Sequence, residues 1–165
     1  KQNIGDILNP LNEKIKEFER KVEETYDRES KQRFSLEKEI KNLFERYSSD
    51  TVQFSAYFPN PSSTQSAIDS FMTLYGLPFS YHLDEMQSEA LKYGIRVLPE
   101  VVVYDHLHDK IIYRGRIDNL FAGLGKRRTR ATERELNECL LAIQSGKKPE
   151  IRFTNAIGCF LEKRH

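Results

Sequence analysis

The sequence predicts an α/β protein that carries a long, charged helical segment at its N-terminus. Between residues 10 and 47, apolar residues recur in steps of three and four, which is the spacing of one helix face. After residue 51, segments with strand periodicity alternate with segments that have helix periodicity, as in proteins whose parallel strands are connected by helices. A chain of 165 residues is long enough for one domain with a real core. We therefore expect a helical segment at residues 1–35 and an α/β domain at residues 36–165.

The first helical region is expected over residues 10–47. Its apolar positions are Leu11, Ile15, Phe18, Val22, Ile40, Leu43, Phe44 and Tyr47. Pro10 is typical of a first helical turn, and the polar residues 27–35 interrupt the stripe, so the pattern predicts either two helices with a weak joint or one long kinked helix. We expect the stripe to pack against the domain. The alternative is a coiled-coil seam, although three heptads are hardly filled.

Signals for a strand, a helix and a second strand follow. Apolar residues alternate with polar ones at Val52, Phe54, Ala56 and Phe58, which predicts a strand with unlike faces. Ser62 and Gln65 have the spacing of a capping box, so a helix should open there and end at Gly76. Residues 77–83 predict a short strand.

The same signals continue along the second half of the domain. Asp84 and Gln87 repeat the capping geometry and predict a helix that ends at Gly94. Residues 101–103 are three consecutive valines, which predict a strand covered on both faces, and the turn at 105–109 connects it in a hairpin to residues 110–115.

One more capping box precedes the last long helix. Thr132 and Glu135 have the required spacing. Leu136, Leu140 and Ile143 then line one face of a helix that should stop near Gly146.

Composition excludes several classes of function. Positive and negative side chains nearly cancel, for a formal net charge of +1, so no global charge attracts nucleic acid or an anionic membrane. No apolar run approaches the roughly 18 residues of a membrane span, and residues 1–30 lack the apolar core of a secretion signal. The two cysteines form no C-x-x-C pair and are too few for a four-cysteine zinc site.

Three motifs resemble the thioredoxin-like fold in its redoxin branch, which includes peroxiredoxins and exported thiol-disulfide oxidoreductases. They are YGIRVLPEVVVYD at 93–105, IIYRGRIDN at 111–119 and TNAIGC at 154–159. The resemblance covers residues 36–161 and implies a thioredoxin-like three-layer sandwich. It also implies thiol-disulfide or peroxide chemistry, a thiol or disulfide partner protein or a small peroxide as substrate, and a periplasmic or otherwise extracytoplasmic location. We expect no cofactor, and the balanced charge predicts no nucleic-acid partner.

The resemblance also implies a site. The residue matching Pro99 is usually a cis proline beside the catalytic cysteines, and a cis bond before proline costs only about 0.5 to 1 kcal/mol. Leu98 would then offer its backbone carbonyl and amide to an extended substrate, and Cys159 matches a terminal glycine-cysteine pair that an adjacent redox domain often follows. The alternatives are that Pro99 only begins a strand and that Cys159 is an unreactive thiol.

The nucleophile of such an enzyme is absent from this chain. It belongs at the end of a first strand, yet no cysteine precedes Cys139. We expect an upstream segment to supply the strand and its cysteine, and the chain alone to be inactive. The alternative function is a non-catalytic binding or scaffolding module in a multidomain redox protein.

Other side chains have structural and functional interpretations. Cys139 lies on the apolar face of the last helix and is expected to be a buried structural cysteine. Arg114 and Arg116 are expected to order a loop through Asp118 or Glu100. The alternatives are that Arg116 binds a substrate carboxylate and that Glu100 accepts a proton during thiol exchange.

Two polar clusters remain. GKRRTRAT at 125–132 holds four positive charges in a loop before a helix, where an anion could bind, although a solvated loop is the favoured interpretation. A phosphate or nucleic-acid binder using this loop is a third function hypothesis. His106 and His108 have no evident third ligand, so no metal site is predicted.

Overall fold

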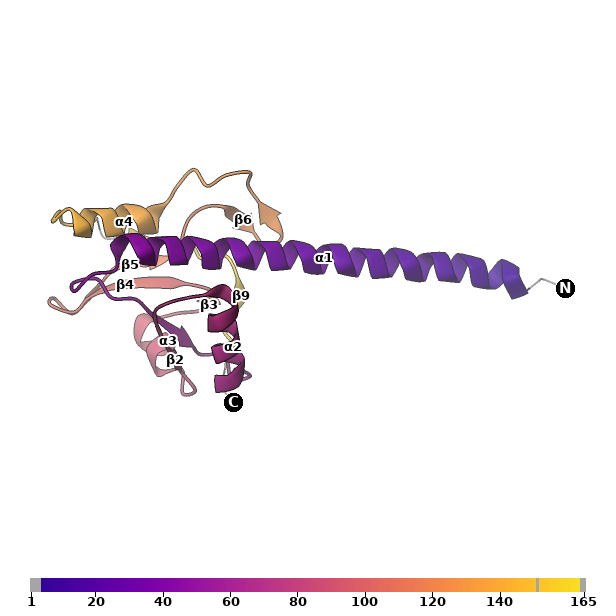
Figure 1. The fold of residues 1–165 in the computed structure, drawn as a ribbon, viewed down its shortest axis with the longest axis horizontal. Helices are drawn as coiled ribbons and strands as arrows, with labels where there is room; N and C mark the ends of the chain where they lie inside the picture. The colour runs from indigo at the N-terminus through magenta and orange to yellow at the C-terminus, as the bar shows by residue number, and fades with distance from the viewer. Residues whose placement is uncertain (1–3, 151, 164–165) are drawn as a thin grey trace. The chain divides into compact units, whose positions relative to one another are not determined.

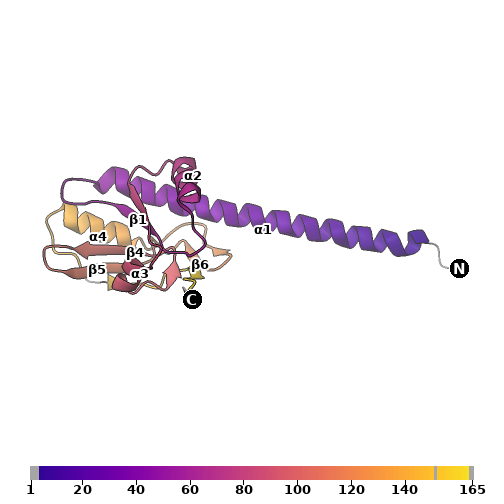
Figure 2. The same cartoon turned by 90° about the horizontal axis from the view of Figure 1, so that it is seen from below.

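The computed structural model describes the backbone of residues 4–150 and 152–163 and the side chains of residues 13–22, 36–150 and 152–163. The chain divides into two compact units, residues 1–35 and residues 36–165. A single helix, α1 (Ile4–Tyr47), contributes to both units (Figures 1 and 2). Of the two alternatives for the first region, the structure has the continuous helix, and it begins at Ile4 rather than at Pro10.

The second unit contains the remaining helices and all the described strands. In chain order these are β1 (Ser55–Phe58), α2 (Gln65–Tyr75), β2 (Ser80–Leu83), α3 (Ser88–Tyr93), β3 (Val97–Leu98), β4 (Val101–Asp105), β5 (Lys110–Gly115), β6 (Phe121–Gly123), β7 (Lys126–Arg127), α4 (Glu135–Gln144), β8 (Arg152–Phe153) and β9 (Cys159–Phe160). The predicted α/β class is confirmed in this mixed form, and the predicted hairpin of residues 101–103 and 110–115 is the antiparallel pair β4 and β5.

The strands form four small sheets. β1 pairs with β2 in parallel, β4 and β5 pair antiparallel with β8 parallel on the far side of β5, and β3–β9 and β6–β7 are antiparallel pairs. No described strand is hydrogen-bonded to both β1 and β4, so these two groups remain separate sheets. The three-layer thioredoxin-like sandwich is therefore not confirmed, because no described strand bridges β1 and β4.

The core lies between the end of α1, strand β5 and helix α4. Its buried members are Leu43, Tyr47, Ile112, Tyr113, Ile117, Leu136, Cys139 and Leu140. In Figures 1 and 2, α4 and the last turns of α1 lie on one side of β4 and β5, and α3 lies on the other side. The Tyr47 hydroxyl donates to Asn137 Oδ1 at 2.9 Å, which connects α1 to α4 at the edge of this core.

The capping residues predicted for the helix N-termini differ from those in the structure. Helix α2 is capped by Thr64, whose Oγ1 accepts from the Ala67 amide at 3.3 Å, and not by the predicted pair Ser62 and Gln65. Because a threonine oxygen serves the same purpose two residues later, the helix begins there. Its predicted end at Gly76 is confirmed, with φ at 57°.

Helix α3 has a related arrangement. Gln87, with φ at 56°, directly precedes the helix and makes no side-chain cap. Asp84 satisfies the first turn instead, since its carboxylate accepts from the Ala90 amide at 3.0 Å and from the Ser88 hydroxyl at 3.1 Å. The predicted stop at Gly94 is confirmed, with φ at 69°.

Among the described residues, no helix combines the length and the apolar character needed to cross a membrane.

Candidate nucleic-acid interface

The structure brings three of the predicted site residues together. β3 and β9 pair so that Leu98 lies opposite Cys159, and the Leu98–Pro99 peptide bond is cis. Gly158 approaches this bond closely, because a Cβ atom there would lie 2.0 Å from the Leu98 carbonyl oxygen. Leu98, Pro99 and Cys159 therefore lie close together where the two short strands β3 and β9 pair.

The other two predicted site residues have protein partners. Glu100 Oε1 lies 3.5 Å from Arg114 Nε, and burial raises the pKa of the Glu100 carboxyl, an effect that the Arg96 backbone and Arg114 oppose. Arg116 instead forms ion pairs with Glu133 and Glu135. The arginines do order loops, although Arg116 uses neither Asp118 nor Glu100 as its partner.

The two cysteines differ in environment. Cys139 is buried, and desolvation raises the pKa of its thiol to about 11, so the prediction of a structural cysteine is confirmed. Cys159 is exposed, and both thiols are free. Arg152 forms ion pairs with Glu138 and Glu150.

A small cleft beside α4 has an acidic lining. It has a volume of about 100 Å³, and its carboxylates come from Glu135, Glu138 and Glu150. Arg152 also lines the cleft and pairs with Glu138 and Glu150, while Glu135 pairs with Arg116, so these carboxylates already have cationic partners. No group of three His, Cys, Asp or Glu side chains in the described part of the chain has the arrangement of a metal site. His108 Nδ1 is instead paired with Asp105 Oδ2 at 2.7 Å.

The second unit has a hairpin rich in exposed basic side chains. Strands β6 and β7 pair with Gly123 opposite Lys126, and Gly125 makes the turn with φ at 71°. The cationic side chains on and after β7 are all exposed: Lys126, Arg127, Arg128 and Arg130. None of them forms an ion pair with an acidic side chain within the described residues. We call residues 121–130 the basic hairpin.

Asn119 holds the base of the basic hairpin. Its side chain is 3% exposed, its Oδ1 accepts from the Thr132 and Glu133 amides at 2.8 and 3.1 Å, and its Nδ2 donates to Thr132 Oγ1 at 2.8 Å. The Arg128 side chain adds a bond to the same residue, because its Nε donates to the Asn119 backbone carbonyl at 2.9 Å. These bonds join the two ends of the loop, so the hairpin projects from a defined base.

The same contacts explain why the capping box at Thr132 is wrong. The Thr132 hydroxyl is bonded to Asn119, and α4 begins only at Glu135, whose N-cap position is Arg134 with no side-chain cap. Glu135 is held by Arg116. The sequence analysis missed Asn119, because a buried asparagine has no periodic signal; its place directly after Asp118, in a turn-like DN pair, was the only available hint.

The Arg116 ion pairs lie next to this base. Arg116 donates to Glu133 Oε2 at 2.5 Å and, through Nε, to Glu135 Oε1 at 3.1 Å. The bond to Glu135 raises the pKa of the guanidinium. For Glu135, burial alone would raise the pKa of the carboxyl, but hydrogen bonds from Arg116 and the backbone prevail and lower it. These carboxylates are occupied by Arg116 and not by the cations of the hairpin.

Comparisons with known proteins identify relatives of the N-terminal part. Residues 2–56 match the model of the RmuC family. A DNA recombination protein RmuC homolog of Pseudomonas aeruginosa is 50% identical over 42 residues, and one of Neisseria meningitidis is 46% identical over 43 residues. Each alignment covers 26% of this chain, and the chain spans only 9% and 7% of those relatives.

Two solved structures of bacterial proteins share the fold of most of the chain. A hypothetical protein of Sinorhizobium meliloti has a TM-score of 0.62 and 25% identity, covering 76% of this chain and 69% of its own. An uncharacterized conserved protein of Geobacillus kaustophilus has a TM-score of 0.64 and 23% identity, covering 78% of this chain and 69% of its own. The names of these two proteins assign no function.

These findings correct the redoxin assignment. The matched family is RmuC, its members bear the name of DNA recombination proteins, and the predicted redox function and its redox partners are wrong. The motifs have structural causes instead: Pro99 precedes β4, Arg114 and Arg116 form ion pairs, and Gly158 packs against Leu98. The described residues contain no disulfide.

The exclusion of nucleic acid is corrected by the same relatives. The net charge of +1 is an average over the whole chain, whereas recognition of phosphates depends on local charge. A near-neutral protein can therefore present a surface such as the basic hairpin.

Proposed function

We propose that this chain binds DNA through the basic hairpin and acts in DNA recombination. The observation that carries the proposal is the exposed group Lys126, Arg127, Arg128 and Arg130, which has no acidic partner within the described residues. The RmuC match over residues 2–56 supports the recombination context.

The hairpin has the properties of a backbone-contacting element. Exposed cations bind DNA mainly through phosphates and the release of counterions, without reading sequence. Asn119 fixes both ends of the loop, so less conformational freedom is lost on binding than for an unanchored basic loop. The apolar tip, Leu124, is 71% exposed and adds a side chain that can lie in a groove.

The test is DNA binding by the full chain, measured by fluorescence anisotropy with labelled double-stranded and single-stranded oligonucleotides over a range of salt concentrations. We expect weak, sequence-independent binding that falls steeply with salt. With about four phosphate contacts the slope of log K against log salt should be about −3 to −4.

The decisive variant is the double substitution Lys126→Ala and Arg127→Ala. Loss of two phosphate contacts should reduce the salt slope by about 2 and weaken binding in proportion for every sequence. The matched control is Lys147→Ala with Lys148→Ala, which removes two exposed cations located after α4. Equal losses from both double variants would show binding without a defined site, and no binding by the unmodified chain would refute the proposal.

A further inference from the structure

The first unit has an apolar stripe that its own helix leaves uncovered. Ile15 is 47% exposed, Phe18 is 69% exposed and Val22 is 52% exposed. Three large apolar side chains in line on one helix face are an unfavourable surface in water, and burial against a partner would relieve that cost.

The stripe has the spacing of a coiled-coil seam. Steps of three and four place Ile15 and Val22 at a positions and Phe18 at a d position of a heptad. In the sequence the same spacing continues toward the N-terminus at Leu11, Leu8 and Ile4. β-branched residues at a positions, such as Ile15 and Val22, favour two-stranded parallel coiled coils.

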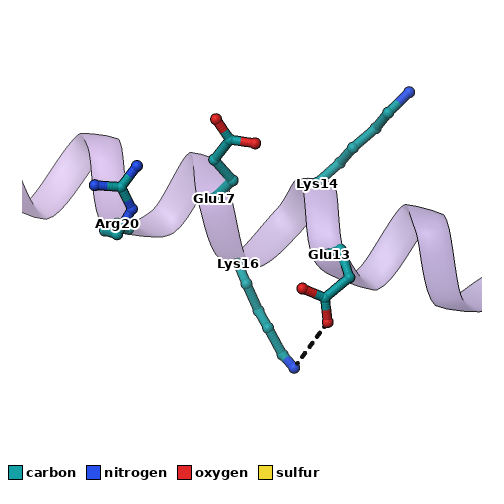
Figure 3. Close-up of a pocket in the computed structure, with 5 residues that line it drawn as sticks. All are labelled: Glu13, Lys14, Lys16, Glu17 and Arg20. Atoms are coloured by element: carbon teal, nitrogen blue, oxygen red, sulfur yellow. Dashed lines mark hydrogen bonds and ion pairs between the residues drawn. The ribbon is translucent and has the colours of Figure 1, made fainter.

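The charges of residues 13–22 are divided between two faces. On the outer face, Lys16 pairs with Glu13 at 3.3 Å (Figure 3). Lys21, at the g position before Val22, pairs with Glu17 of its own helix at 2.7 Å. Lys14 and Glu19 occupy the g and e positions beside the seam, and neither has an ion-pair partner within the described residues. In Figure 3 the Lys14 side chain extends away from the helix.

We propose that α1 forms a parallel, two-stranded coiled coil with a second copy of this chain through the seam of Ile15, Phe18 and Val22. In a parallel pair, a g residue faces the e residue five positions later on the other helix. Lys14 of one copy then faces Glu19 of the second copy, and the reciprocal pair forms by symmetry. In an antiparallel pair g faces g and e faces e, which brings lysines together and glutamates together. The charges therefore select both the partner and its direction.

This inference is independent of the DNA-binding proposal, because it uses other residues and another unit. A short seam should give a weak dimer, so self-association is expected to depend on protein concentration. Substitutions in the basic hairpin should leave it unchanged, which separates failure of one proposal from failure of the other.

The experiment is sedimentation velocity of the full chain over a concentration series. The unmodified chain should shift from monomer toward dimer as concentration rises. Phe18→Glu should abolish the shift, whereas Arg20→Gln, on the outer face, should not. Circular dichroism of each variant checks that the helix is retained.

Charge variants test the direction of the helices and do not alter the apolar seam. Lys14→Glu and Glu19→Lys should each weaken the homodimer about tenfold, since each replaces two attractive pairs by two repulsive ones. An equimolar mixture of the two variants should associate at least as well as the unmodified chain, because opposite charges then face each other in the mixed dimer. A chain that stays monomeric at every concentration would overturn the proposal. Unchanged association of Lys14→Glu alone would overturn the parallel arrangement, because an antiparallel pair only exchanges one like-charged contact for another.

Discussion

The two units of the chain use similar residues in opposite ways. Ile15, Phe18 and Val22 in the first unit are exposed, while Leu43 and Tyr47, on the same helix but in the second unit, are 2% and 3% exposed. Ion pairs differ in the same manner: Glu17 and Lys21 form an exposed pair along the helix, whereas Glu135 is buried against Arg116. Helical periodicity is thus common to both units, but only in the second unit are the apolar residues of the helix buried in a core.

The largest difference is expected for truncation of an apolar side chain. Leu43→Ala should lower the free energy of unfolding of the second unit by about 3 kcal/mol, because it removes contacts and leaves a cavity in the core. Ile15→Ala should change it by less than about 0.5 kcal/mol, since the side chain is exposed. Urea denaturation followed by near-ultraviolet circular dichroism of the tyrosines measures both. Equal effects would break the distinction between the units.

An effect of intermediate size is expected when the buried ion pair of the second unit is compared with the exposed ion pair of the first. Glu135→Gln should cost about 2 kcal/mol, because Arg116 loses a buried charged partner. Glu17→Gln should cost about 0.3 kcal/mol, which is typical of an exposed pair along a helix. The measurement is the same denaturation series, and a cost for Glu17→Gln as large as that for Glu135→Gln would contradict it.

The pH dependence of the Glu135 contribution follows from the direction of its pKa shift. The folded state lowers the pKa of Glu135 below its ordinary value of 4.5, so the folded state favours the deprotonated form. The stabilisation is complete above the unfolded pKa and is lost as pH falls through the folded pKa. Below pH 4.5, stability should therefore fall more steeply in the unmodified chain than in Glu135→Gln.

A smaller effect on stability is expected at Asn119. Asn119→Ala should lower the free energy of unfolding by about 1.5 kcal/mol, because the amides of Thr132 and Glu133 lose their acceptor. It should also weaken DNA binding more than Lys147→Ala does, since the base of the hairpin is released. Anisotropy and denaturation on the same samples test both parts, and unchanged DNA affinity would show that the hairpin needs no fixed base.

The last prediction compares the two thiols by reaction rate and not by stability. Cys139 is buried with a pKa of about 11, so little thiolate is present near neutral pH, whereas Cys159 is exposed. One thiol per chain should react quickly with a colorimetric disulfide reagent under native conditions, and the second only after denaturation. Cys159→Ser should remove the fast phase, and its persistence in that variant would contradict the assignment.

Local signals predicted many elements of the second unit. Glycines 76 and 94 end helices as expected, and the valines at 101–103 begin the β4–β5 hairpin. Capping boxes were less reliable. Thr64 rather than Ser62 caps α2, and the Thr132 hydroxyl accepts a hydrogen bond from Asn119 instead of capping α4. A hydroxyl near a helix start has several amides within reach, and the packed structure selects among them.

The sequence predicted one of the two features that define the candidate interface, the cluster of cations, but not their lack of acidic partners. The four cations lie within the five residues 126–130, so their clustering was evident, although a solvated loop was favoured. Their lack of acidic partners was not evident, because Glu133 and Glu135 follow closely and are occupied by Arg116 only in the folded chain. The redoxin motifs misled for a related reason, since turn and strand-start chemistry recurs in many α/β proteins.

By itself the sequence determined the periodicities, several helix ends and the local concentration of charge, since these depend on residues close together along the chain. The tertiary structure alone decided which apolar positions are buried, which carboxylates meet Arg116 and how Asn119 closes the basic hairpin. Burial and pairing depend on segments far apart in sequence, and a stripe such as Ile15, Phe18 and Val22 has the same pattern whether or not another surface covers it.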